Sequence, residues 1–219
     1  MILEKLKQNN LSQRAITSII FVPVMLILTW LGGMSYIIFT LLISSLCIRE
    51  LCLMVKKDKK HWKYWFYGTF LCIVFLFLNL VSIRGQGLRE SMFLLFVVWT
   101  TDTSAYFFGI SIGGRKIAPQ ISFGKTWSGF VGALICSGLF GLISHFIGLT
   151  KFSNNIIETM LDTIFISFCS QSGDLAESAL KRYFEVKDSG DTLPGHGGLL
   201  DRFDGMIFAS FAMAGLIAN

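Results

Sequence analysis

The chain has 219 residues, of which 53% are hydrophobic and only 15% are charged, and its mean hydropathy is +0.62. Soluble domains carry about 25% charged residues. This composition therefore excludes a disordered chain, a coiled coil and a basic nucleic-acid-binding module, and it argues against an ordinary soluble globule. It predicts a chain made mostly of transmembrane helices.

Long apolar segments follow one another along the chain. The 34 positions between Arg14 and Arg49 hold no charge, which suits two spans broken at Gly32–Gly33. The expected fold class is all-α, a polytopic membrane helical bundle forming one domain over residues 1–219. Seven transmembrane helices are predicted, at about 15–31, 34–48, 64–83, 91–112, 127–149, 156–172 and 199–218.

The basic residues predict how these spans are oriented. Of the 19 Lys and Arg residues, 16 fall in segments on the same side as the N-terminus, and the other three are Arg84, Arg89 and Lys151. Cytoplasmic loops carry the excess of Lys and Arg. We therefore expect an uncleaved first span, a cytoplasmic N-terminus and an external C-terminus. The expected location is the cell inner (cytoplasmic) membrane, with the polar segments described below facing the cytoplasm.

Acidic residues concentrate near the end of the chain. Residues 171–204 hold half of the 14 Asp and Glu residues. Asp174 directly follows an apolar segment, and Asp201 and Asp204 open the last one with a spacing that places both on one helical face. Carboxylates at membrane-helix ends are costly unless they are paired, hydrated or metal-bound. We expect these three to bind Mg²⁺, which prefers carboxylate and phosphate oxygens.

A structural role is the alternative for these acids. Asp201 would then cap the last helix, and Asp204 would pair with Arg202 or Lys181. The adjacent segment Pro194-Gly195-His196-Gly197-Gly198 favours a binding site, because glycines let backbone N–H groups approach a phosphate. His196 can equally donate to a phosphate or hold the loop.

A second polar segment follows the fourth predicted span. Asp102 lies within an apolar run, where an acid suggests function, although a hydrogen-bonded structural Asp is an equal alternative. Gly113-Gly114-Arg115-Lys116 and Gly124-Lys125-Thr126 then place cations beside glycines. This arrangement is typical of a phosphate-binding surface, but it lacks the spacing of a P-loop. Both polar segments fall on the side assigned to the cytoplasm, so they are expected to form one site for phosphoryl or nucleotidyl transfer.

The segment Ser178–Asp204 closely resembles the signature of the phosphatidate cytidylyltransferase (CDP-diacylglycerol synthase) family. The match reads S-x-L-K-R-x4-K-D-x-G-x2-L-P-x-H-G-G-L-x-D-R-F-D. Segments 171–178 and 102–106 are also similar to that family, and the similarity extends over about residues 15–219. Phe123 and Ser128 depart from it, because the family commonly has Pro and Glu in their places.

The resemblance implies an Mg²⁺-dependent transfer of a cytidylyl group from CTP to phosphatidate, giving CDP-diacylglycerol and pyrophosphate in phospholipid biosynthesis. The expected partners are CTP, phosphatidate and the membrane, with no nucleic acid and with a homodimer left open. Catalytic roles are expected for Asp174, Asp201, Asp204, Lys181, Arg182, Lys187 and Asp188, of which the first three would be the metal ligands. Substrate contacts are expected from Asp102, Arg115, Lys116, Ser122, Lys125, Thr126, Ser178, His196, Gly197, Gly198 and Arg202.

Three other functions compete with this interpretation. A CDP-alcohol phosphotransferase shares the start of its D-x-x-D-G pattern with Asp201–Gly205, but no charged residue follows Met206. A CTP-using lipid kinase of similar architecture is the second alternative. A transporter coupling ions through Asp102 and Asp174 is the third, although the sequence has neither the inverted repeats nor the broken helices typical of one.

Overall fold

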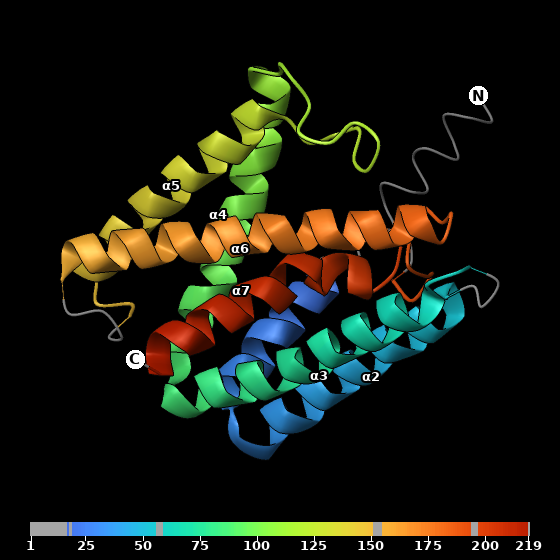
Figure 1. Cartoon of the computed structure of the whole chain (residues 1–219). Coiled ribbons are helices and arrows are strands. Elements are labelled where there is room, and N and C mark those ends of the chain that lie inside the picture. Colours follow the sequence, from blue (N-terminus) through green and yellow to red (C-terminus); the bar gives the residue numbers. More distant parts are fainter. Residues whose placement is uncertain (1–16, 18, 56–58, 151–154, 194–196, 219) are drawn as a thin grey trace, which may run out of the picture.

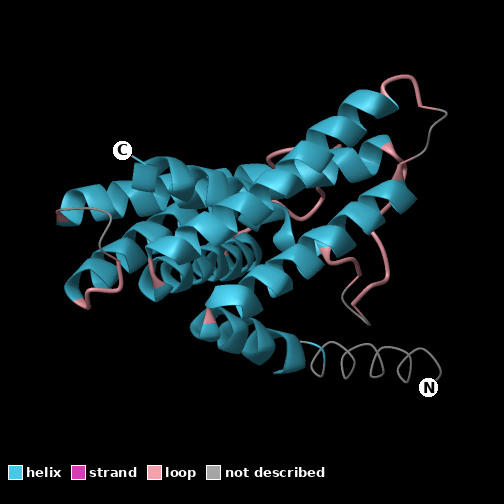
Figure 2. Ribbon diagram, turned by 90° about the horizontal axis from the view of Figure 1, so that it is seen from below, coloured by secondary structure: helices cyan, strands magenta, loops and turns pink. Residues whose placement is uncertain are grey.

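The computed structural model describes residues 17, 19–55, 59–150, 155–193 and 197–218, and within them it contains seven helices and no strand (Figures 1 and 2). His196, together with residues 194 and 195, lies outside the described residues. The all-α prediction is confirmed. The helices are Ile19–Leu31, α2 (Gly33–Met54), α3 (Trp62–Gln86), α4 (Leu88–Ser111), α5 (Trp127–Phe146), α6 (Ile156–Tyr183) and α7 (Leu200–Ala218).

The predicted break between the first two helices is present at Gly32. Gly32 has φ of 65°, a left-handed conformation that glycine adopts without strain. The Arg84 guanidinium packs against this turn, donating to the carbonyls of Thr29 at 2.8 Å and Trp30 at 3.2 Å. A Cβ at Gly32 would lie only 2.3 Å from Arg84 Nη2. The long uncharged segment thus forms two helices, because a glycine turn held by Arg84 separates them.

Helix α6 lies across the middle of the molecule, with α5 above it, α7, α3 and α2 below it, and α4 crossing behind it (Figure 1). It packs against both α5 and α7. Small residues make the α5 contacts close: a Cβ at Gly141 would lie 2.5 Å from Thr163 Oγ1, and one at Gly132 would lie 2.4 Å from Phe108. Small residues at such contacts are how membrane helices bring their backbones together.

Four of the described helices, α2 to α5, are long and apolar enough to cross a membrane by length and composition. Large apolar side chains on their outer faces, such as Met34 and Ile38 of α2, are exposed, as expected for surfaces that contact lipid. These features are those of a multi-pass membrane protein. The predicted count of seven spans is not established, because Ile19–Leu31 is shorter and because α6 and α7 carry the acidic and basic residues of the polar segments.

The polar segments assigned to one side of the membrane contact one another. Lys59, before α3, forms an ion pair with Glu185, which follows α6. Arg182, at the end of α6, donates to the carbonyl of Ile121 in the α4–α5 segment at 3.2 Å. At the other helix ends, Arg89 donates to the carbonyl of Gly148 at 3.2 Å. The packing therefore groups the segments as the Lys and Arg distribution predicts.

Candidate functional site

The candidate site is built on a close contact between α6 and α7. A Cβ at Gly173 would lie 2.7 Å from the Asp204 carbonyl oxygen, and one at Gly205 would lie 2.6 Å from Ser170 Oγ. Only residues without a side chain allow the two helices to approach this closely. The contact brings Asp174 of α6 beside Asp204 of α7, as the sequence predicted.

Three carboxylates from three helices gather around this contact. Asp204 lies near Asp174, Glu177 and Asp102, so that negative charges on these groups disfavour a charge on Asp204, and Asp174 disfavours a charge on Asp102 in the same way. Asp102 comes from α4, so the two polar segments meet at this contact. Like charges in a partly buried place are unfavourable unless a cation compensates them.

Lys125 is the cation that the α4–α5 segment contributes to these carboxylates. Its Nζ lies 2.7 Å from Asp174 Oδ2, and its charge also acts on Asp102. Thr126, the next residue and a predicted substrate contact, is buried. Its hydroxyl has a structural role, because it accepts from the Gly129 N–H and caps α5. Ser128, at the position where the family commonly has Glu, donates to the Gly113 carbonyl and ties this segment together.

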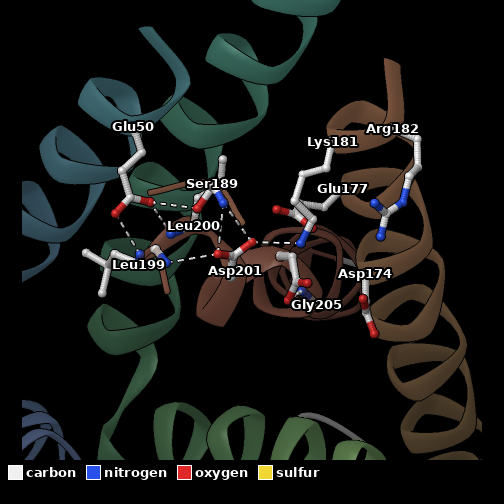
Figure 3. A network of polar contacts seen from close by, with 12 residues as sticks. Glu50, Asp174, Glu177, Lys181, Arg182, Ser189, Leu199, Leu200, Asp201 and Gly205 are labelled. Atoms are coloured by element: carbon white, nitrogen blue, oxygen red, sulfur yellow. Dashed lines mark hydrogen bonds and ion pairs between the residues drawn. The ribbon is translucent and has the colours of Figure 1, made fainter. Parts of the chain in front are cut away.

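Asp201 has different surroundings, which Figure 3 shows. It accepts from Lys181 Nζ at 2.7 Å, from the Ser189 N–H at 3.0 Å and from the Gly198 N–H at 2.9 Å. Lys181 also contacts Glu177, with 2.6 Å between Nζ and Oε2. The side chains of this Lys–Glu–Asp group are largely buried. The ion-paired part of the structural alternative fits this geometry, with Lys181 on Asp201 and not on Asp204, whereas the backbone donors to Asp201 precede α7 and do not belong to its first turn.

The donor set can be compared with the needs of Mg²⁺. Among the described residues, no group of three or more His, Cys, Asp or Glu side chains is arranged to hold a metal ion. Magnesium is usually held by one or two carboxylates together with waters and substrate phosphates. Asp174 and Asp204 are two neighbouring carboxylates, which is the number that such a site usually uses. The oxygens of Asp201 are already engaged by three donor groups.

The remaining predicted residues surround this centre at greater exposure. Ser178 is half-buried on α6, and Ser122 is half-buried in the α4–α5 segment. Gly197 and Gly198 lie directly before α7, where a Cβ at Gly198 would collide with Ser189 Oγ at 1.9 Å. Arg182 holds the backbone of the α4–α5 segment. The exposed members of the predicted set are Asp102, Arg115, Lys116, Arg182, Lys187, Asp188 and Arg202.

Two apolar pockets of about 210 Å³ each lie on either side of α7. The first, against α4, has Asp102 and Arg202 among its polar lining residues. The second, between α3 and α6, has Glu177 and Asp204. Apolar spaces that border carboxylates and cations suit a ligand with a charged head and hydrocarbon chains. The other lining residues are Thr17, Phe21, Val22, Met25, Val98, Trp99, Leu193, Phe203 and Met206 in the first, and Tyr64, Trp65, Gly68, Thr69, Cys72, Gly173, Ala176, Leu180, Leu200, Ile207 and Phe208 in the second.

Sequence reasoning missed two acidic residues of this region. Glu177 is one of several acids in its segment, and Glu50 lies outside both polar segments. Glu50 is almost completely buried on α2 and contacts the start of α7. A carboxylate at the end of a long uncharged segment was the available signal, because such a group needs partners when it is buried.

The comparisons with known proteins place this chain in a family. Residues 56–218 match the family model described as the cytidylyltransferase family. Proteins named phosphatidate cytidylyltransferase are similar over 132 residues, 60% of this chain: those of Staphylococcus haemolyticus (47% identical), Staphylococcus aureus (43%) and Bacillus subtilis (42%). The matched region covers 50%, 50% and 48% of those relatives, so the chain spans about half of their length. Because the family model covers most of the chain, this protein belongs to the cytidylyltransferase family.

Proposed function

We propose that this protein transfers the cytidylyl group of CTP to phosphatidate and releases pyrophosphate, in phospholipid biosynthesis. The pairing of Asp174 and Asp204 beside Lys125, next to two apolar pockets, is the observation that carries this proposal. The names of the relatives support the same substrates. In the reaction a phosphate oxygen of phosphatidate bonds to the α-phosphorus of CTP, and the bond from that phosphorus to the pyrophosphate oxygen breaks.

The protein's part is positioning and charge compensation. The phosphate nucleophile is already anionic and needs little help from a base, so the main obstacle is bringing it to the charged triphosphate. Asp174 and Asp204 would hold Mg²⁺, which neutralises phosphate charge when bound. Lys125 already lies beside these carboxylates and would contact a phosphate. To act as a third metal ligand, Asp201 would have to release Lys181. Its role as a ligand therefore stays a prediction.

The exposed basic residues would attract CTP, and the pockets would admit the lipid. Arg115, Lys116 and Lys187 lie in the segments assigned to the cytoplasm. Arg202 borders the pocket that also contains Asp102. We propose that this side faces the cytoplasm of an inner membrane, where CTP is dissolved, while the acyl chains stay in the bilayer. Contacts among the α2–α3, α4–α5 and α6–α7 segments support the proposal that all three lie on one side of the membrane.

A labelling assay tests the reaction and separates it from the lipid-kinase alternative. Purified protein in detergent is incubated with Mg²⁺, phosphatidate and CTP labelled at either the α- or the γ-phosphorus. We expect the α-label in CDP-diacylglycerol and the γ-label in pyrophosphate. A γ-labelled lipid, formed with diacylglycerol in place of phosphatidate, would indicate a kinase. No labelled lipid in either arm would overturn the proposal.

Cysteine labelling tests the orientation. In a variant whose native cysteines are replaced by serine, Lys60→Cys and Gln86→Cys place single exposed thiols at opposite ends of α3. An impermeant reagent added to intact cells should label the Gln86→Cys protein alone. Labelling of the Lys60→Cys protein from outside would contradict the proposed topology.

A further inference from the structure

Glu50 is a buried acid that the proposed chemistry does not use. It lies on α2, four residues before the helix ends at Met54, and it is only 1% exposed. A buried carboxylate is costly unless hydrogen bonds compensate for its lost hydration. Its side chain packs against the backbone of Gly190, where a Cβ would lie 3.1 Å from Glu50 Cγ. Glu50 therefore contacts the segment between α6 and α7 directly.

Among the described residues, the Glu50 carboxylate accepts three hydrogen bonds, all from Ser189 and from the start of α7 (Figure 3). Oε1 accepts from the Leu199 N–H at 2.8 Å, and Oε2 accepts from the Leu200 N–H at 2.8 Å. Oε2 also accepts from Ser189 Oγ at 2.9 Å. The first N–H groups of a helix lack partners within the helix and favour a negative charge. Glu50 supplies both the acceptors and the charge for α7, from another helix.

The same segment is held on its other side by Asp201. Ser189 donates its hydroxyl to Glu50 and its backbone N–H to Asp201, so one residue joins the two carboxylates. Asp201 in turn contacts Lys181 of α6. A continuous polar chain thus runs from α2 through the first turn of α7 to α6, as Figure 3 shows.

This chain fixes where Asp204 lies. Asp204 is four residues after Leu200, about 6 Å along the helix axis, and the helix between them is rigid. A shift at the first turn of α7 therefore moves Asp204 relative to Asp174. A misplacement of about 1 Å can cost a large part of a reaction rate.

We propose that Glu50 is a positioning residue of the active site, which acts by fixing the first turn of α7 and through it Asp204. This inference rests on the proposed function. The alternative is that Glu50 caps α7 and contributes to stability alone. The two differ in the turnover of the folded protein, which a purely stabilising cap leaves unchanged.

The test compares Glu50→Gln and Glu50→Asp with Glu90→Gln in the full-length protein. Gln presents an N–H₂ group where one of the accepting oxygens was, so at least one backbone N–H loses its partner. Glu90 is the matched control, because it is also buried but lies in the first turn of α4. For each variant, kcat, both KM values and the melting temperature are measured, with rates expressed per folded molecule.

We expect Glu50→Gln to lower kcat roughly 10- to 100-fold with smaller changes in KM. Glu50→Asp, which keeps the charge but is shorter, should recover part of that loss, and Glu90→Gln should keep normal kcat. Ser189→Ala should lower kcat less, and its effect should not add to that of Glu50→Gln, because the two side chains share one hydrogen bond. Normal kcat per folded molecule in Glu50→Gln would overturn the proposal.

Hydrogen exchange of the peptide covering residues 188–203 provides a readout without substrate. Glu50→Gln should speed exchange there, whereas Glu90→Gln should not. If the wild-type protein makes no CDP-diacylglycerol but this local difference is present, the proposed function fails while the anchoring role of Glu50 stands. Unchanged exchange in a folded Glu50→Gln variant would overturn the anchoring itself.

Discussion

Carboxylates lie in two neighbouring regions of α7, the first turn and the contact with α6 one turn further along. The two regions differ in the groups that surround those carboxylates. At the first turn, Glu50 and Asp201 receive hydrogen bonds from backbone N–H groups, from Ser189 and from Lys181. At the contact, Asp204 accepts from the Gly205 N–H and lies near the acids Asp174, Glu177 and Asp102, of which Asp174 is paired with Lys125. Carboxylates with many donors stabilise a fold, whereas neighbouring like charges leave room for a cation. The comparison separates residues that build the site from residues that would act in it.

The largest effect is expected at the like-charged pair. Asp174→Asn or Asp204→Asn should lower the rate of CDP-diacylglycerol formation by about 100-fold or more, because the charge that would hold Mg²⁺ is removed. The melting temperature of Asp204→Asn should stay the same or rise, since repulsion is relieved, whereas Asp174→Asn also loses the ion pair with Lys125 and should not gain stability. Initial rates against Mg²⁺ concentration and thermal unfolding check both. Asp162→Asn, earlier on α6, is the control and should keep normal activity. An Asp174→Asn variant with normal rate and Mg²⁺ dependence would refute the proposed site.

The next effect is expected at the cation beside this pair. Lys125→Ala should reduce the rate about 10- to 100-fold, because a charge-assisted phosphate contact is lost. Lys125→Arg should recover only part of it, since the guanidinium has a different contact geometry. Steady-state rates against CTP and phosphatidate measure these losses. Lys60→Ala removes an exposed cation assigned to the same side and serves as the control. Equal activity of Lys125→Ala and Lys60→Ala would show that Lys125 merely follows the charge bias of the loops.

At the hydrogen-bonded group, a loss of stability is expected together with a loss of rate, because Asp201 belongs to the polar chain that fixes the first turn of α7. Asp201→Asn weakens the contact with Lys181 and should lower the free energy of unfolding by about 2 kcal/mol, as for a hydrogen bond to a charged group. The Mg²⁺ concentration needed for half-maximal activity should stay unchanged. Thermal unfolding and a Mg²⁺ titration of activity test the two halves. A shifted Mg²⁺ requirement would instead make Asp201 the third ligand that the sequence predicts.

The smallest effect concerns the helix contact that creates the like-charged pair. Gly173→Ala adds a Cβ that would lie 2.7 Å from the Asp204 carbonyl oxygen, so α6 and α7 must separate slightly. We expect a loss of about 1 kcal/mol in stability from this overpacking, together with a lower rate. Gly215→Ala on α7 is the matched control, because nothing lies within 4 Å of its added Cβ. Equal melting temperatures and rates in the two variants would contradict the importance of this contact.

Much of the fold could be predicted from local sequence features. The uncharged segment after Arg14 had to contain two helices, because it is too long for one span and holds Gly32–Gly33. The acids and cations of the site could be named as well, because charged residues beside apolar segments are rare and need partners. The expected span 156–172 was shorter than α6, which continues through the polar residues to Tyr183. Apolarity marks the membrane-spanning part of a helix and not its end.

The partners of those residues were decided by tertiary structure. Asp174, Asp201 and Asp204 were grouped by spacing alone, yet packing turns Asp201 toward Lys181 and the segment before α7, and leaves Asp204 beside Asp174. Glu50 accepts from Leu199 across 149 positions of sequence. Helical periodicity describes neighbours three or four residues apart, and no local pattern encodes which buried acid meets which helix end. The sequence by itself thus determined the helices and the chemical groups, while the close approach of small residues between helices decided which groups meet.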